Sequence, residues 1–435
     1  MKPPSEKDIP IEDVISIHDH EELRPPDGGK RAWLIVVGSF LGLFAIFGNT
    51  YSFGLFLNYY NKAVYPGNMN VLSWIGSICV ALFFILGPIN RQVMKKMGYM
   101  YMLGTGTILC TAALILASFA TQVWHVFLSQ GVLFGLGSSF IWFPCITGPA
   151  QWFSERRGLA IGCAMAGSGV GGLILSNICQ AIIKNPSMGY RWALRVDGII
   201  CFFLLSLATL LVRPLGKENY TIKTEQQQQE QQKGIISWYL FKNPQFCVLF
   251  MVGLITTFGY MAPSNLLPSH ADSIQLNPWV GANLSAIMSA INACARIGTG
   301  YMGDKLGRFN SLCICAFFAG LSCLLIWMNV HNEATLWAFA VLYGVFSGGY
   351  VTFFPTVQPQ VVGLENINQA VGLLYLTNTV GYLFGVPIAT ALMNKSTPPN
   401  YQYAAAWSGS VIVLGSIFAF WLRVQRGGWK LFKKV

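Results

Sequence analysis

Runs of about twenty or more apolar residues recur along this chain of 435 residues, and they restrict its fold more than any motif does. A helix of that length is long enough to cross the hydrocarbon core of a bilayer. Apolar residues make up 54% of the chain and charged residues only 10%, which is typical of integral membrane proteins. Nothing resembles a basic nucleic-acid-binding patch with interleaved aromatic residues. We therefore predict an all-α integral membrane protein with the lipid bilayer, and no nucleic acid, as a partner.

The eleven cysteines all lie inside apolar runs, and none of them forms a CxxC pair. A disulfide framework or a thiolate metal site would need regularly spaced cysteines, which are absent from the loops. We interpret these cysteines as small packing residues. The sequence therefore predicts no metal site and no cofactor, and the absence of a catalytic constellation argues against an enzyme.

The apolar runs predict twelve membrane-spanning helices, with boundaries near 33–57, 71–90, 99–120, 123–148, 158–183, 193–212, 245–268, 279–302, 311–330, 335–358, 368–393 and 404–423. They form two groups of six, at 33–212 and 245–423. We expect 1–32 to be a disordered cytoplasmic tail, 213–244 to be a cytoplasmic linker around a glutamine-rich run, and 424–435 to be a basic cytoplasmic tail.

The basic residues predict which ends of the spans face the cytoplasm. If both termini are cytoplasmic, the tails and cytoplasmic loops hold 22 of the 28 Lys and Arg residues, and the outer loops hold Lys62, Lys184, Arg191 and Lys395. This asymmetry follows the positive-inside rule. We therefore expect a multi-pass protein with both termini in the cytoplasm. The plasma membrane is the expected location, and an organellar membrane is the alternative.

The two groups of six spans repeat each other. A Phe-Pro pair ending at Pro144 recurs 211 residues later with Pro355, and Gly98 in one charged turn matches Gly307 in another. Two related halves with proline-interrupted spans are typical of secondary transporters, whose halves rock about a central site. Helix kinks without a hinge role are the alternative explanation of the prolines.

One arginine, Arg296, lies inside the eighth span, roughly 10 Å from its nearer end at a rise of about 1.5 Å per residue. Inserting an arginine at that depth costs about 2.5 to 3.5 kcal/mol, so the side chain needs a partner or a polar cavity. Asn292, one turn earlier, favours a helix face that points into a cavity. The arginine is also long enough to snorkel to the membrane surface, and its position alone leaves both explanations open.

The turn after the eighth span carries the motif of a known family. Its GxxxDKxGR spacing, set by Gly300, Asp304, Lys305, Gly307 and Arg308, resembles the cytoplasmic gating motif of the major facilitator superfamily. The acid at a helix end can meet the positive N-terminal end of a neighbouring helix.

Two further stretches indicate one particular family within this superfamily. Pro26–Gly29, followed by Ala32 and Trp33, and the run Trp152–Gly162, followed by the small residues Ala166–Gly169, are similar to the two signatures of the monocarboxylate-transporter-like family, in its fungal-type branch. The resemblance covers essentially all of the chain after residue 24. It implies a major facilitator fold, with twelve transmembrane helices arranged as two pseudo-symmetric six-helix bundles.

The resemblance also implies a function, which is the transport of small organic anions by alternating access. In that family an arginine of the eighth span pairs with the substrate carboxylate, and Arg296 stands at that place. Whether protons move with the substrate stays open, because Tyr51 and Asn292 stand where other members resemble one another in a lysine and an aspartate. Asp197 is the one carboxylate within a span, and we interpret it as a structural ion pair with Arg195, with a proton relay as the alternative.

Nine residues are expected to line the central binding site, because their spans surround the cavity in folds of this kind: Asn49, Tyr51, Trp142, Tyr260, Asn292, Arg296, Phe353, Tyr375 and Asn378. They would supply one cation, several amides and aromatic walls, which suit a planar or aromatic carboxylate. Lipid-facing or packing roles are the alternative for each aromatic residue.

Three functions therefore remain open. The first is a secondary transporter of a small organic anion, resembling a monocarboxylate transporter. The second is a uniporter or exporter of a neutral vitamin-like or sugar-like solute. The third is a membrane sensor that binds a ligand without transporting it, although the two short tails contain no recognisable signalling domain.

Overall fold

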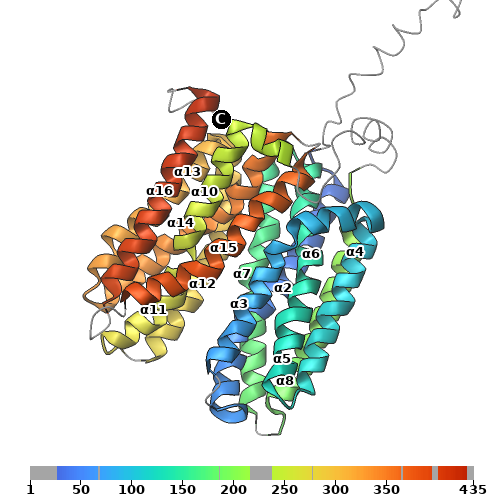
Figure 1. The fold of residues 1–435 in the computed structure, drawn as a ribbon, viewed down its shortest axis with the longest axis vertical. Coiled ribbons are helices and arrows are strands. Elements are labelled where there is room, and N and C mark those ends of the chain that lie inside the picture. The colour runs from blue at the N-terminus through green and yellow to red at the C-terminus, as the bar shows by residue number, and fades with distance from the viewer. Residues whose placement is uncertain are drawn as a thin grey trace, which may run out of the picture.

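The computed structural model describes residues 27–66, 69–185, 187–215, 238–276, 278–363, 366–393 and 400–428. Within these residues the chain is all-helical (Figure 1). The expectations for the first 26 residues, the glutamine-rich run and the last seven residues fall outside the described part of the chain.

In the described residues, the N-terminal half contains six helical segments, namely α2 (Lys30–Tyr59), α3 (Met69–Ile85), α4 (Gly87–Ser118), α5 (Val123–Val126) continuing through η2 (Phe127–Leu133) into α6 (Phe134–Trp152), α7 (Arg157–Lys184) and α8 (Gly189–Leu211). The C-terminal half contains six more, namely α10 (Pro244–Tyr260) followed by α11 (Ala262–Ser273), α12 (Pro278–Leu306), α13 (Arg308–Leu325), α14 (Glu333–Val362), α15 (Ile367–Met393) and α16 (Tyr401–Gly427). The short elements are η1 (Tyr60–Val64), η3 (Trp238–Lys242) and η4 (Trp327–Asn329).

Ten of these segments are long and apolar enough to cross a membrane. The other two segments in the described residues are α3, whose apolar part is the shorter Trp74–Ile85, and α12, which contains Arg296. The twelve predicted spans are therefore confirmed as a twelve-helix architecture, and the chain is a multi-pass membrane protein.

Two glycines end helical segments at matching places in the halves. Gly98 has a φ of 76° inside α4, and Gly307 has a φ of 101° between α12 and α13. Glycine adopts such left-handed angles without the steric cost of a Cβ atom. The stretch of α4 before Gly98 thus turns away from the span that follows it, as α12 does before α13.

The two halves form side-by-side bundles that meet closely at one end (Figure 1). α7 packs against α12, and α3 and α4 pack against α15. Along the α7–α12 interface, a Cβ atom on Gly158 would lie 2.5 Å from the Gly300 carbonyl oxygen, and one on Gly169 would lie 2.6 Å from the Ala293 Cβ. Helix backbones approach this closely only where small residues face each other.

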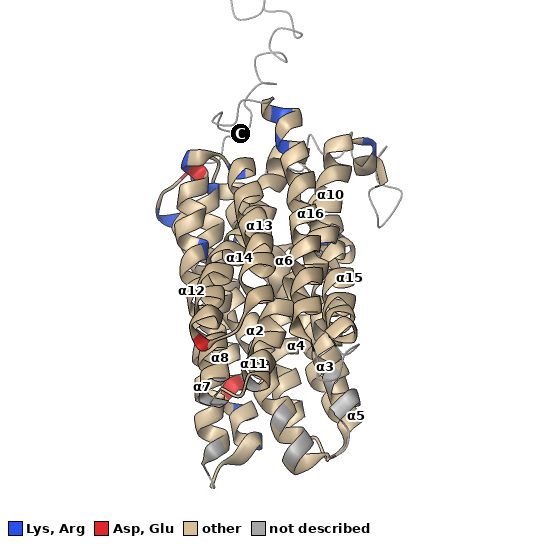
Figure 2. Cartoon of the chain, turned by 90° about the vertical axis from the view of Figure 1, so that its left-hand side faces the viewer, with Lys and Arg blue, Asp and Glu red and all other residues tan. Residues whose placement is uncertain are grey.

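We call this closed end of the molecule the Asp304 end. Figure 1 shows the bundles separating toward the opposite end, where α11 and the start of α12 lie far from α3. Most Lys and Arg residues in the described ribbon lie near the Asp304 end, and the middle of the helices is almost free of charge (Figure 2). Charges collect outside the region that a hydrocarbon layer would cover.

Candidate functional site

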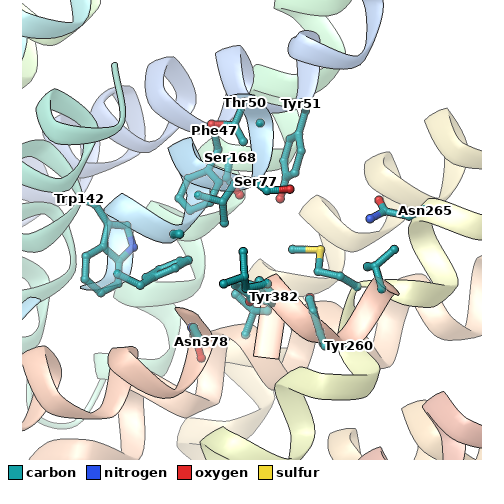
Figure 3. A pocket seen from close by; sticks show the side chains of 18 of the residues that line it. Phe47, Thr50, Tyr51, Ser77, Trp142, Ser168, Tyr260, Asn265, Asn378 and Tyr382 are labelled. Atoms are coloured by element: carbon teal, nitrogen blue, oxygen red, sulfur yellow. The ribbon is translucent and has the colours of Figure 1, made fainter. Parts of the chain in front are cut away.

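A cavity of about 380 Å³ lies between the two halves (Figure 3). α2, α3, α6 and α7 form one wall, and α10, α11, α12, α14 and α15 form the other. In Figure 3, Thr50 and Tyr51 face Tyr260 and Tyr382 across the space. The volume lies within the range of small-molecule sites, and a cavity between two mobile halves can hold a transported solute.

Aromatic rings dominate the lining of this cavity. Rings from the two halves touch: Tyr375 of α15 lies edge-on to Trp142 of α6, with ring centroids 4.3 Å apart, and stacks on Phe84 of α3 at 5.7 Å. Such walls favour flat, aromatic ligands. The aromatic lining residues are Phe47, Tyr51, Phe53, Phe84, Trp142, Tyr260, Tyr350, Phe354, Tyr375 and Tyr382.

Arg296 reaches from α12 across the interface to α7, and its side chain does not snorkel to the surface. The residue is 5% exposed. Its Nη1 donates to the carbonyl oxygen of Met165 at 2.7 Å and also to the hydroxyl of Ser168. Its Nε is buried and has no hydrogen-bond partner in the described chain. The guanidinium therefore joins the halves and keeps unused donor capacity.

Arg296 is the one charged residue among the described residues that line the cavity, and no carboxylate lines it. A cation in a site of low dielectric interacts strongly with an opposite charge. A buried charge without a partner is unfavourable by several kcal/mol. The cavity therefore presents a guanidinium without a counter-ion, an arrangement that favours an anionic ligand.

Six of the nine predicted pocket residues line the cavity, namely Tyr51, Trp142, Tyr260, Arg296, Tyr375 and Asn378. The other three lie elsewhere. Asn292 donates to the Ser347 hydroxyl within its own half, at 2.9 Å. Phe353 fills the space beside Gly303 toward the Asp304 end. Asn49 lies behind the α2 wall of the cavity and lines a separate small void.

The predicted gating motif connects the two halves at the Asp304 end. The Asp304 carboxylate of α12 accepts hydrogen bonds from the backbone N–H groups of Gly158 and Leu159 at the start of α7, each at 2.9 Å. A carboxylate at a helix N-terminus satisfies free N–H groups and interacts favourably with the helix dipole. This end is therefore held closed by charge-assisted hydrogen bonds.

Arg308 strengthens the same junction from the start of α13. Its Nε donates to Asp304 Oδ1 at 3.1 Å, and its Nη2 donates to the backbone carbonyls of Ser154 and Glu155 in the opposite half. Lys305 lies instead over the Tyr301 ring one turn back on α12, 4.4 Å from its centroid. The motif thus works through one acid, one arginine and the close glycine contact beside it.

The sequence alone indicated no structural role for Asp27, which holds the turn before α7 from within the N-terminal half. Its carboxylate accepts hydrogen bonds from the N–H groups of Ser154 and Glu155, the second at 2.7 Å. Its own N–H donates to the Trp152 carbonyl at 3.2 Å. Asp27 therefore binds the turn before α7, and Asp304 of the other half binds the first residues of α7. An acid directly before two glycines and a helix start was the available signal.

The cavity also contains residues that the sequence did not single out. α3 supplies Ser77 and Phe84, although the second span was not considered as part of the site. Ser168 and Met165 on α7 bind the guanidinium. The small-residue run around Ser168 was the one signal that this helix approaches another closely.

Comparisons with known proteins agree with this architecture. A model of the Major Facilitator Superfamily matches residues 39–364 and 284–433. The chain is 30% identical over 411 residues to MFS transporter asaE of Aspergillus flavus, covering 94% of this chain and 90% of that protein. It is 28% identical to the Fujikurins efflux protein of Gibberella fujikuroi, covering 95% and 88%. It is similar in fold to the transporter FucP in its outward conformation, with a TM-score of 0.67 and 14% identity, covering 89% of this chain and 98% of FucP.

Proposed function

Because this chain belongs to the Major Facilitator Superfamily, we propose that it is a secondary transporter of a small aromatic organic anion, and that it works by alternating access. We infer the substrate class from Arg296, a buried guanidinium without a counter-ion in the wall of an aromatic cavity. A neutral solute would leave that charge unpaired, whereas a carboxylate would pair it.

The guanidinium suits a carboxylate in shape as well as charge. Its planar fork can make two parallel hydrogen bonds to the two carboxylate oxygens. The Nε that has no partner is available for one of them. The aromatic rings opposite would hold the flat part of the substrate, and the amide of Asn378 and the hydroxyl of Tyr260 could bind further polar groups.

The same arginine offers a link between binding and movement. In this closed-end state its Nη1 binds α7 through Met165 and Ser168. A substrate carboxylate competes for the guanidinium and so weakens one of the contacts between α7 and α12. Binding would then favour the state in which the Asp304 end opens, because a ligand shifts a conformational equilibrium by its differential affinity for the two states.

The direction of transport is proposed from the relatives. The similar protein of Gibberella fujikuroi is named as an efflux protein, which supports export. The charge asymmetry supports a cytoplasmic Asp304 end, and export from the cell would require the plasma membrane as the location. The resemblance of the Trp152–Gly162 run supports a monocarboxylate-like substrate.

The test replaces Arg296 with lysine and measures counterflow of labelled aromatic acids, such as phenylacetate and indole-3-acetate, in proteoliposomes. Lysine keeps the positive charge but lacks the planar guanidinium that makes two parallel hydrogen bonds to a carboxylate. Arg296→Lys should therefore reduce flux by more than about tenfold, close to the loss in Arg296→Ala. Arg195→Lys, at a half-buried arginine outside the cavity, is the matched control and should keep wild-type flux.

The other outcomes separate the alternatives. A fully active Arg296→Lys variant would reject carboxylate pairing and favour the carrier of a neutral solute. Saturable binding of the acids to the wild-type protein without counterflow would favour the sensor.

A further inference from the structure

Asp197 of α8 is a carboxylate buried inside the N-terminal half, and no described residue is its cationic partner. The residue is 1% exposed. The predicted ion pair with Arg195 is wrong, because Arg195 donates instead to the Ser118 hydroxyl at 3.2 Å and lies over the Phe119 ring, 4.9 Å from its centroid. Asp197 therefore needs an explanation other than a structural salt bridge.

The helices that pack against α8 place no described cationic side chain beside Asp197. From α2, the Asn49 Nδ2 donates to Asp197 Oδ1 across a long 3.4 Å. From α7, the Cys179 thiol lies beside the carboxylate, and from α8 itself Cys201 is the next titratable group. α4 presents the apolar Leu114 and Ile115, which a Cβ atom on the neighbouring Gly198 would meet.

The second carboxylate oxygen of Asp197, Oδ2, is buried and has no hydrogen-bond partner in the described chain. An ionised carboxylate in such a place would be an unpaired buried charge, which is far more costly than an unpartnered neutral hydroxyl. The neutral carboxylic acid fits this site. Its Oδ1 still accepts from Asn49, and the proton lies on Oδ2.

A route for that proton leads from the central cavity. A void of about 30 Å³ lies behind the cavity wall and is lined by Asn49, and it is large enough for a water molecule. Thr50, Phe53 and Gly76 line both the void and the cavity, so the two spaces adjoin at these residues. Asn49 lines the void and also donates to Asp197, so it links the void to the carboxylate.

We propose that Asp197 is a proton-binding site within the membrane, loaded from water in the central cavity through the void beside Asn49. Loading transfers one proton from a hydronium ion in the cavity water to Oδ2 of the carboxylate and leaves the side chain neutral. Release returns the proton to a water molecule, and the Asn49 donor then stabilises the carboxylate that forms. Asn49 directly precedes the cavity residues Thr50 and Tyr51 on α2. A change in the protonation of Asp197 can therefore shift the part of α2 that lines the transport cavity. This inference goes beyond the proposed function, since carriers of anionic or neutral solutes could both use it.

The test is an infrared pH titration of the purified full-length protein in lipid nanodiscs, with no ligand added. The wild-type protein should show a carboxylic-acid C=O band at neutral pH that disappears as the pH is raised. The band should be absent in Asp197→Asn. It should be unchanged in the control Glu333→Gln, which removes a carboxylate at the exposed start of α14.

A second variant keeps the proposal testable if Asp197→Asn does not fold. Asn49→Ala removes the donor to Oδ1 and should shift the frequency of the same band. Spectra without such a band in the wild-type protein, or with a band that neither variant changes, would overturn the proposal. These outcomes do not depend on a substrate, so they are distinct from a failure of the Arg296 test.

Discussion

A methyl group added at Gly169 should open the Asp304 end of the protein. The new Cβ would lie 2.6 Å from the Cβ of Ala293 on the facing helix, and 3.2 Å from the Ser289 carbonyl oxygen. Carbon atoms in contact prefer about 3.5 to 4.0 Å, so α7 and α12 must separate locally by about 1 Å. Neither Cβ atom can turn away, because both are fixed to helix backbones.

The expected size of the effect follows from that clash. Overpacking costs about 1 to 3 kcal/mol, and the cost falls on the state in which α7 and α12 touch. Such a free-energy difference changes the ratio of closed to open molecules by about 5- to 150-fold. Gly169→Ala should therefore convert part of the population to a state with a separated Asp304 end.

The assay is a pulsed electron paramagnetic resonance measurement between spin labels at Tyr101 on α4 and Trp421 on α16. These positions lie toward the Asp304 end in different halves, and their side chains are 68% and 51% exposed. Cys294→Ser serves as the background, because Cys294 is the exposed cysteine in the described chain. A longer label-to-label distance should appear in Gly169→Ala.

Two further variants test the reasoning. Ala293→Gly removes the opposing methyl group, so the double variant Gly169→Ala/Ala293→Gly should regain most of the closed population. Gly298→Ala is the matched control in α12, since a Cβ there meets no atom within 4 Å. A wild-type distance distribution in Gly169→Ala, or an equal shift in Gly298→Ala, would refute the argument.

Two other predictions concern the topology and the linker. A glycan should be added at Asn394, whose NKS sequon is expected to face outward, and never at Asn219, whose NYT sequon is expected to be cytoplasmic. A glycosylation shift on gels reports both, and modification at Asn219 would reverse the proposed orientation. Deleting 224–233 should leave flux within about twofold, because a flexible linker only has to span the gap between the halves. Loss of flux in a correctly localised deletion variant would reveal a specific role for the linker.

The sequence predicted the fold because the features that determine it are local. A membrane span needs only a sufficiently long apolar run, which can be recognised without knowing its neighbours. Pro144 and Pro355 lie inside α6 and α14 as their spacing indicated, and Gly98 and Gly307 adopt matching left-handed turns. The hinge role of the prolines stays a prediction.

The lining of the cavity was harder to predict, because it depends on how each helix is rotated about its axis. Adjacent residues on a helix point about 100° apart at about 3.6 residues per turn. Phe354 lines the cavity, whereas its neighbour Phe353 packs against Gly303. Arg296 could be identified from the sequence because a charged side chain within an apolar span is energetically costly and therefore marks a candidate functional residue. Asn292 shows the limit of that reasoning, since Ser347 of its own half accepts its hydrogen bond.

The central claim is that an unpaired guanidinium selects an anion, and an acid compared with its own amide tests this most directly. Phenylacetate and phenylacetamide have nearly the same shape and differ in charge. Inhibition of labelled indole-3-acetate counterflow by each compound should be measured in wild-type proteoliposomes. The account predicts that the acid inhibits at a concentration at least about tenfold lower than the amide, since a buried charge-assisted pair contributes more than about 1.4 kcal/mol. Equal inhibition, or stronger inhibition by the amide, would contradict it.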